Sequence, residues 1–289
     1  ARTVDCPSPT DTSRHPRDGL PMTLKVLING VEADGVVPVT DSSVLRGDGC
    51  FEVIRSYAGR PFAMEDHLDR LDRSAKALEI PLPDRRDLEQ WVEQAAVSCD
   101  DCLVRVVVTR GPAMPGITGD PIVIVFAHAL GKGESPATLL PVPAPWHAAG
   151  AEWELAGAKV LSYAPNMAAT RRAIAEGFGD ALLTTIDGVM LEGPTFSVAW
   201  VVDGVIETPG LELGILDSIT RRVMLQLASE LGIEVVEGKW DLDRLDRAQE
   251  AMALSTVREI QPVSAIGRHR FQEGPVTADL GRLFYQRLY

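Results

Sequence analysis

The sequence contains no apolar run long enough to cross a membrane, so we expect no membrane partner. It is also short of positive charge, because 28 Lys and Arg stand against 41 Asp and Glu, for a formal net charge of −13. Nucleic acids and anionic membranes bind basic faces, and this balance argues against both as partners. The 289 residues, 45% of them hydrophobic, suffice for two modest domains or one large one with a real core.

Cysteine is scarce as well, with only Cys6, Cys50, Cys99 and Cys102. The last two form a C-x-x-C motif in "SCDDCLV", a spacing that also occurs in metal and redox sites. Zinc would need a second pair of ligands nearby, which is absent, so we expect no metal. A redox dithiol usually opens a helix, whereas this pair precedes the predicted strand "CLVRVVVT". We therefore expect a reduced pair without a special function.

The beginning of the chain lacks the apolar central region of a secretory signal. Residues 1–22 are rich in Pro, Asp, Ser and Thr, and Met22 is a candidate internal start. Further on, "GKGESPA" combines Gly, Pro and charge between two apolar strands, which is typical of a linker. We therefore predict a flexible tail over 1–22, a small α/β domain over 23–131, a linker over 132–138 and a large domain over 139–289.

Apolar periodicity predicts strands alternating with helices in both halves. In the first half we expect mostly antiparallel strands near residues 24–29, 50–57, 102–109 and 121–130, with helices over 66–78 and 86–98. In the second half, Asp-Gly pairs predict hairpins between strands 181–186, 189–202 and 205–209. Helices are expected over 166–176, 218–232, 242–248 and at the C-terminus, with further strands over 138–145, 234–238 and 250–256. The fold class is α/β (α+β), with two layers that close on a shared crevice.

Lysine is rare, and only Lys25, Lys76, Lys132, Lys159 and Lys239 are present. Four of them have an ordinary solvated position on a strand, helix or linker. Lys159 lies instead among small and apolar residues in "AGAKVL". Burial disfavours the charged form of an amine and leaves a nucleophile of the kind that forms Schiff bases. The alternative is a lysine at the edge of a loop whose amine reaches water.

Three further segments carry polar groups in unusual places. Glu192 is a carboxylate within the apolar run "VMLEGPTFSV", where it should be at an edge or paired. Ser218 and Thr220 in "LDSITRR" begin a helix, and they predict either an anion site or an ordinary cap. Ser255 and Thr256 end a strand. An amine, an internal carboxylate and two hydroxyl-rich anion sites are what pyridoxal phosphate requires.

At these residues the chain resembles the class IV, or fold-type IV, pyridoxal-phosphate aminotransferases, nearest to the D-amino-acid transaminase and aminodeoxychorismate lyase branches. The resemblance runs from about Val26 to Val263. It rests on segments that include "RGDGCFEVIRSY", "DHLDRLDRSAKAL", "KVLSYAPNMAATRRAIAEGFGDALL" and "STVREIQPV". It implies a small N-terminal and a larger C-terminal domain, with the pyridoxal phosphate in the crevice between them, and a homodimer.

The resemblance also implies roles for individual residues. Lys159 would be the Schiff-base lysine, Glu192 the partner of the pyridine nitrogen and Arg70 the phosphate-binding arginine. The other expected cofactor contacts are Tyr163, Ser197, Ser218, Ile219, Thr220, Ser255 and Thr256. The chain departs from the family pattern at Ser162 and Ser197, where asparagine is frequent, and at Arg46, where an aromatic residue is frequent.

The substrate carboxylate needs a cationic partner, and four arginines are candidates. We favour Arg110, which matches an arginine of the two nearest branches, with Arg46 as a second contact and Arg55 as a further one. Arg105 lies on the opposite face of the same strand from Arg110. For each arginine, an ion pair at the surface is the alternative.

The resemblance implies a ping-pong transamination between an α-amino acid, with the D configuration favoured, and a 2-keto acid through a Lys159 Schiff base. We expect a cytoplasmic enzyme. One alternative is an aminodeoxychorismate lyase that releases pyruvate and 4-aminobenzoate, and a second is a branched-chain amino acid aminotransferase. A third is a binding module in which Lys159 has only a structural role.

Overall fold

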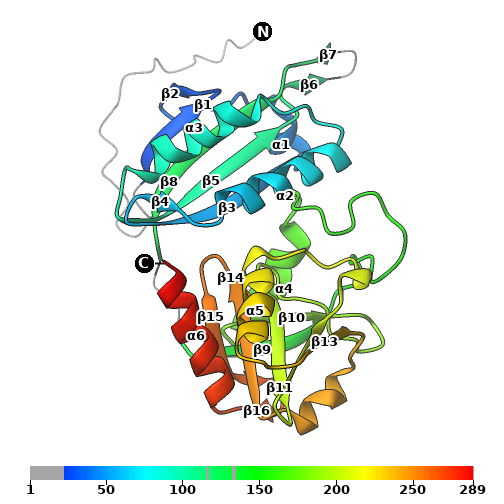
Figure 1. Ribbon diagram of the computed structural model, residues 1–289. Helices are drawn as coiled ribbons and strands as arrows, with labels where there is room; N and C mark the ends of the chain where they lie inside the picture. The colour runs from blue at the N-terminus through cyan, green and yellow to red at the C-terminus, as the bar shows by residue number, and fades with distance from the viewer. Residues whose placement is uncertain (1–22, 115–116, 132–134, 289) are drawn as a thin grey trace.

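The computed structural model of the chain describes residues 23–114, 117–131 and 135–288. Two β-sheets, each with its own helices, lie one above the other, and each sheet comes from one half of the chain (Figure 1). This agrees with the predicted mixed α/β fold in two layers. The predicted tail over 1–22, including Met22, lies outside the described residues.

The first half forms a six-stranded, antiparallel sheet in the order β2-β1-β8-β5-β3-β4, as the sequence predicts for this half. Its strands are β1 (Thr23–Ile28), β2 (Val31–Glu32), β3 (Gly49–Tyr57), β4 (Arg60–Pro61), β5 (Asp101–Thr109) and β8 (Ile122–Ala129). The helices of this half are α1 (Ser42–Arg46), α2 (Met64–Ala77) and α3 (Arg85–Ala96), and a separate short hairpin joins β6 (Ala113–Met114) to β7 (Ile117–Thr118).

Successive side chains along β3 and β5 point to opposite faces of this sheet, and the two faces have different residues. Ile54 and Val104 point towards α2 and α3, and both are fully buried in the core of this half. Residues of the opposite parity, such as Phe51 and Arg105, lie on the other face and line a cavity. One face of the sheet therefore forms a core, and the other forms a wall that faces the second half.

The second half forms an eight-stranded mixed sheet in the order β10-β9-β15-β14-β11-β12-β13, with β16 paired to β15. Its strands are β9 (Ala137–Pro143), β10 (Asp180–Thr184), β11 (Ser197–Val202), β12 (Val205–Pro209), β13 (Val235–Gly238), β14 (Glu250–Ser255), β15 (Glu259–Ile266) and β16 (His269–Arg270). The helices are α4 (Ala164–Ala175), η1 (Leu211–Leu213), α5 (Ile219–Glu230), η2 (Leu242–Arg247) and α6 (Pro275–Leu288). Within the described ranges, no helix has the length and apolarity needed to span a bilayer.

Three local predictions differ from the structure. The strand expected over 189–202 begins only at Ser197, because a turn precedes it and Pro194 has no N–H to donate to a ladder. Glu192 therefore lies ahead of β11 rather than within a strand. The sequence did not indicate β15, a strand between two neighbours, because Pro262 lies inside it. β9 begins at Ala137, within the predicted linker, whose residues 132–134 lie outside the described residues.

The expectation of a reduced C-x-x-C pair is wrong in this structure, because Cys99 and Cys102 form a disulfide. α3 ends at Ala96, and the turn before β5 brings the two Cα atoms to 6.1 Å, within the range that a disulfide bridges. As predicted, the motif precedes a strand and does not lie at the start of a helix. Cys50 is free and buried, and burial raises its pKa to about 12.

Polar and aromatic contacts join the two halves. Glu259, at the start of β15, accepts hydrogen bonds from Tyr57 Oη and Arg55 Nη1, each at 2.7 Å. Phe62, just after β4, packs against Phe284 of α6 with ring centroids 5.5 Å apart. These contacts tie the β3–β4 hairpin of the first half to β15 and α6 of the second.

Candidate active site

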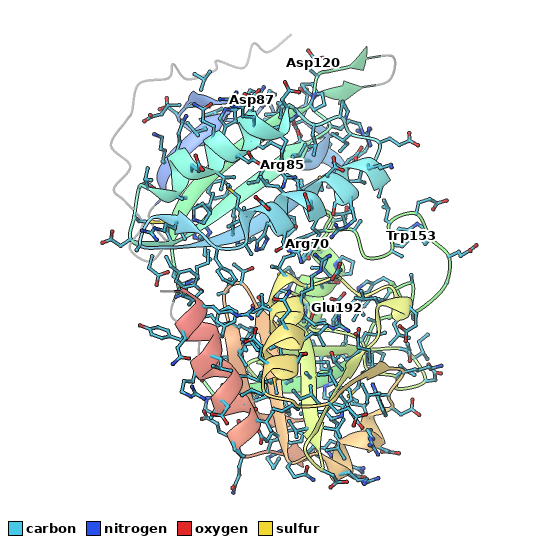
Figure 2. All side chains as sticks on the ribbon, viewed as in Figure 1. Arg70, Arg85, Asp87, Asp120, Trp153 and Glu192 are labelled. Carbon is cyan, nitrogen blue, oxygen red and sulfur yellow. A yellow bond between two sulfur atoms is a disulfide. The ribbon has the colours of Figure 1, made fainter. Side chains whose placement is uncertain are left out.

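A cavity of about 1790 Å³ lies between the two sheets. Its first wall is the exposed face of β3, β5 and β8, and its second wall consists of loops and helix ends of the second half. Arg70 of α2 and Glu192 of the second half lie on either side of the boundary between the halves (Figure 2). The cavity collects most of the residues that the sequence singles out: Arg46, Arg70, Lys159, Tyr163, Glu192, Ser197, Ser218, Ile219, Ser255 and Thr256.

Lys159 is held rigidly at the centre of this arrangement. Its residue is only 8% exposed, so the alternative of an amine in bulk water does not hold. Its backbone N–H donates to Ser74 Oγ of α2 at 3.0 Å, and its carbonyl accepts from Phe51 N–H of β3 at 3.0 Å. The first half of the chain therefore positions the backbone of a lysine that belongs to the second half.

Two aromatic rings surround the amine of Lys159. Nζ lies 4.5 Å from the ring centroid of Phe51 and 5.6 Å from that of Tyr163, and it donates to Tyr163 Oη at 3.4 Å. The two rings meet edge to face at 5.3 Å. Within the described part of the chain, Lys159 forms no ion pair with a carboxylate. The amine is therefore shielded by ring faces and is not tied up by a counter-ion.

Arg70 is oriented by a buried carboxylate. Its Nε and Nη2 donate to the two oxygens of Glu52 at 2.7 and 2.8 Å, and its Nη1 donates to the carbonyl of Asp217 at 2.9 Å. His67 Nδ1 lies 2.8 Å from Glu52 Oε2. Burial by itself would raise the pKa of Glu52, but the charge of Arg70 and the hydrogen bonds from Arg70 and His67 outweigh it and hold that pKa well below its usual range.

Two turns of the second half offer donors to an anion. Ser218 caps α5, and its Oγ accepts from Arg221 N–H at 3.3 Å. The N–H groups of Ile219 and Thr220 lie in the first turn of α5 and have no acceptor within the helix. Ser255 Oγ accepts from the N–H of Arg258 at 3.1 Å, which shapes the second turn. Thr220 is buried behind the cavity lining, whereas its neighbours Ser218 and Ile219 lie on it.

Glu192 and Ser197 lie on the opposite side of the cavity from β3. Glu192 Oε2 accepts from Leu216 N–H at 3.2 Å, and Oε1 lies 3.4 Å from His147 Nε2. Ser197 Oγ is buried and has no hydrogen-bond partner among the described residues. A buried hydroxyl without a partner in a cavity wall is what a polar ligand would satisfy.

The arginines are placed differently from the expectation. Arg110 is not among the lining residues, and it donates to Asp48 Oδ2 and to the carbonyl of Leu78, each at 2.6 Å, at the edge of the cavity. Arg55 faces Asp101 and Glu259. Neither lines the cavity, so no contact of the described residues supports a role in substrate binding, and that role stays a prediction.

Arg46 and Arg105 do line the cavity, the latter from the middle of β5. The reason is the parity of β5, because Arg105 shares the face of Val107, whereas Arg110 follows the end of the strand.

One cavity therefore contains an amine, a fixed carboxylate, an arginine with helix N–H groups, and a buried hydroxyl that has no partner among the described residues. This set fits pyridoxal phosphate: the amine suits its aldehyde, the carboxylate its ring nitrogen, and the arginine and N–H groups its phosphate. Together with the two stacked sheets, it defines a pyridoxal-phosphate enzyme of the fold-type IV class. The chain belongs to the amino-transferase class IV family, whose model matches residues 49–266.

Individual relatives share this architecture over most of their length. A fold IV-transaminase from Curtobacterium pusillum is 32% identical and superposes with a TM-score of 0.81, covering 90% of this chain and 92% of that one. The branched-chain aminotransferase of Thermoproteus uzoniensis is 27% identical, with a TM-score of 0.83 and coverage of 92% and 95%. A bifunctional aminodeoxychorismate lyase / D-amino acid transaminase of Mycobacterium tuberculosis is 31% identical over 67% of this chain and 73% of its own.

Sequence reasoning missed Glu52, His67, Ser74 and His147. Glu52 contacts Arg70, and Ser74 contacts the backbone of Lys159. His67 contacts Glu52, and His147 contacts Glu192. All four therefore support a predicted residue, His67 through Glu52 and the others directly. The available signal was a polar stripe on α2, because His67, Arg70 and Ser74 share one helix face with the buried Leu71. No comparable pattern indicated His147, which lies alone in an irregular segment.

The buried Glu52–His67–Arg70 cluster predicts that stability falls in acid. Burial lowers the pKa of His67 below its ordinary value of 6.5, so protonation below that pH favours the unfolded state. The depressed pKa of Glu52 means that its contribution is complete above the ordinary value of 4.5 and is lost as the pH falls further. Urea unfolding over a series of pH values should therefore show two successive losses on acidification.

The variant Glu52→Gln distinguishes the contribution of this cluster from the loss of stability that other titrating groups cause at low pH. It leaves the buried Arg70 without a carboxylate, so we expect it to lower the free energy of unfolding near neutral pH by about 3–5 kcal/mol. Its stability profile should also be flatter below pH 4.5. Glu65→Gln, an exposed position on the same helix, is the matched control and should behave like the parent. A Glu52→Gln protein as stable as the parent would contradict the assigned role.

Proposed function

We propose that Lys159, Glu192, Arg70 and the first turn of α5 form one catalytic site for transamination between an α-amino acid and a 2-keto acid. Pyridoxal phosphate supplies an aldehyde and an electron-withdrawing ring to such a site. The observation that carries the proposal is the buried amine of Lys159, which forms no ion pair with any residue that the structure describes and shares its cavity with Glu192 and the two turns at Ser218 and Ser255.

Each residue then has a physical task. Lys159 Nζ would take the proton from the substrate Cα and deliver it, within the same half-reaction, to the former aldehyde carbon of the bound group, and in the second half-reaction it would move a proton in the opposite direction. Tyr163 Oη, which accepts a hydrogen bond from Nζ, helps to hold the amine in place. Arg70 and the N–H groups of Ile219 and Thr220 bind the phosphate. Glu192 would accept a hydrogen bond from the protonated ring nitrogen, and Ser197 Oγ could donate a hydrogen bond to the bound group.

We propose Arg105 as the group that binds a substrate carboxylate. Its Nε donates to His128 Nε2 at 3.0 Å, and His128 Nδ1 lies 3.0 Å from the carbonyl of Ala129. Nε2 of that imidazole accepts the hydrogen bond from Arg105 and Nδ1–H donates one to the carbonyl, so the ring is neutral and cannot balance the guanidinium. Burial lowers the pKa of Arg105, and no carboxylate of the described residues pairs with it. A half-buried cation that faces a cavity without a counter-ion attracts an anion.

The preferred donor can be identified by assay. Relatives with the names D-amino acid transaminase, aminodeoxychorismate lyase and branched-chain aminotransferase share this fold. The favoured substrate class is an α-amino acid, with D configuration as the first case to test. Panels of D- and L-amino donors with pyruvate or 2-oxoglutarate, run beside an assay for release of 4-aminobenzoate, separate the three activities.

We also propose that the chain forms a homodimer. The segment before Arg46 exposes large aliphatic side chains, with Val36 77% and Val39 78% exposed and with Val44 and Leu45 more than half exposed. Such a group is costly in water and is typical of a surface that another chain covers. It adjoins the cavity wall at Arg46, so the partner would lie close to the site. The expected cytoplasmic location stays a prediction.

The role of Lys159 can be tested by spectroscopy. The purified protein should be yellow and should lose its visible absorption band on treatment with borohydride. Lys159→Ala should lack that band and should lose at least 1000-fold in transamination rate, an order-of-magnitude expectation for removal of both nucleophile and base. Lys239→Ala is the matched control and should keep colour and activity. A coloured Lys159→Ala protein that borohydride reduces would contradict the proposal.

The choice of arginine predicts a difference between two variants. Arg105→Gln should raise KM for the 2-keto acid by about 10- to 100-fold, the effect of losing a charge-assisted hydrogen bond. Arg110→Gln should leave KM within about 3-fold, because the Arg110 side chain is paired with Asp48 and is not part of the cavity lining. Steady-state kinetics of both variants show which arginine binds the substrate carboxylate. A larger rise in KM for Arg110→Gln than for Arg105→Gln would favour Arg110, the residue that the sequence favours.

The dimer can be tested by light scattering after gel filtration. The parent should have twice the chain mass of 31.3 kDa. The double variant Val44→Asp, Leu45→Asp places charge on the exposed patch and should shift the protein towards monomer. Val97→Asp changes an exposed valine at the end of α3, outside this segment, and should leave the mass unchanged. A monomeric parent would overturn the proposal.

A further inference from the structure

His147 contacts the carboxylate of Glu192, and its hydrogen bonds define its tautomer. The residue lies in the segment between β9 and α4, and its ring lines the cavity. The N–H of Ala149 donates to His147 Nδ1 at 3.2 Å, so Nδ1 carries a lone pair and no proton. The proton of the neutral ring is then on Nε2, which donates to Glu192 Oε1 at 3.4 Å.

The two donors hold Glu192 from both sides. Leu216 N–H donates to Oε2 at 3.2 Å, and His147 donates to Oε1. The two side chains are little exposed, 11% for His147 and 15% for Glu192, so water competes weakly for these bonds. The rotation of the carboxylate is thereby restricted, and donors on both oxygens stabilise its negative charge.

We infer that His147 is a positioning residue, which acts through Glu192 on the nitrogen of the bound pyridine ring. The inference rests on the proposed role of Glu192. A carboxylate that must hold a proton on a ring nitrogen has to stay ionised and has to face that nitrogen. The Nε2–H of His147 serves both requirements. It stabilises the charge of the carboxylate, and by bonding to Oε1 it fixes the direction in which the carboxylate points.

Two substitutions of similar size separate this role from a structural one. His147→Asn keeps an acceptor near the position of Nδ1, so the bond from Ala149 N–H can remain, but it removes the donor at the position of Nε2. His147→Gln places an amide N–H near the position of Nε2 and so keeps a donor for Glu192. Each variant thus keeps one of the two contacts of the ring: His147→Asn keeps the contact to Ala149, and His147→Gln keeps the contact to Glu192.

The readout is the affinity of the full chain, freed of cofactor, for two ligands. One is pyridoxal phosphate and the other is an analogue with carbon in place of the ring nitrogen. The parent should prefer pyridoxal phosphate, because only its ring can bond to Glu192. In His147→Asn that preference should fall by about 3- to 10-fold, and in His147→Gln it should stay within about 2-fold. His269→Asn, a histidine paired with Asp246 outside the cavity lining, should match the parent.

The outcomes are distinct. A parent that binds both ligands equally would overturn the proposed role of Glu192 itself. A parent with the preference and a His147→Asn variant that retains it in full would overturn the inference about His147 alone. Equal weakening of both ligands by His147→Asn would show a structural role only and would also overturn the inference.

Discussion

The structure depends on one buried ion pair, between Arg70 of α2 and Glu52 of β3. Both side chains are removed from water, and the pair is stable because two parallel hydrogen bonds and a third contact from His67 compensate the loss of hydration. The remaining guanidinium nitrogen reaches the carbonyl of Asp217, at the start of α5. The pair thus orients a cation into the cavity and at the same time joins the two halves where the anion-binding turn begins.

The charge of the cavity is opposite to that of the whole chain. The protein carries a formal net charge of −13, yet the cavity wall contains Arg46, Arg70, Arg105, Lys159 and Arg258. Two of these are neutralised by carboxylates, since Arg70 pairs with Glu52 and Arg258 with Asp180. Arg105 and Lys159 form no such pair in the described chain. An enzyme for amino and keto acids needs this separation, because its substrates and its cofactor are anions.

Much of the site could be predicted from the sequence, for reasons that differ between residues. Lys159 stood out because its neighbours are apolar, and Glu192 because it interrupts an apolar run. Arg70 has the spacing of a solvated helix residue, and only the resemblance to a family singled it out. The choice among the arginines could not be made from the sequence, because it depends on where β5 ends and on which side chains then reach the cavity. β5 ends at Thr109, so Arg110 lies beyond the strand and outside the cavity lining, whereas Arg105 lies within the strand and lines the cavity.

The sequence by itself determined the local elements and the division into two sheets, and it singled out Lys159 as the candidate for the reactive amine, because these follow from periodicity and from one lysine in apolar surroundings. The tertiary structure decided which side chains support that amine. Ser74, Glu52 and His147 are distant in the chain from the residues they hold, and no spacing within one element encodes those contacts. Even Glu192 owes its direction to donors from two other segments, which only the folded chain brings together.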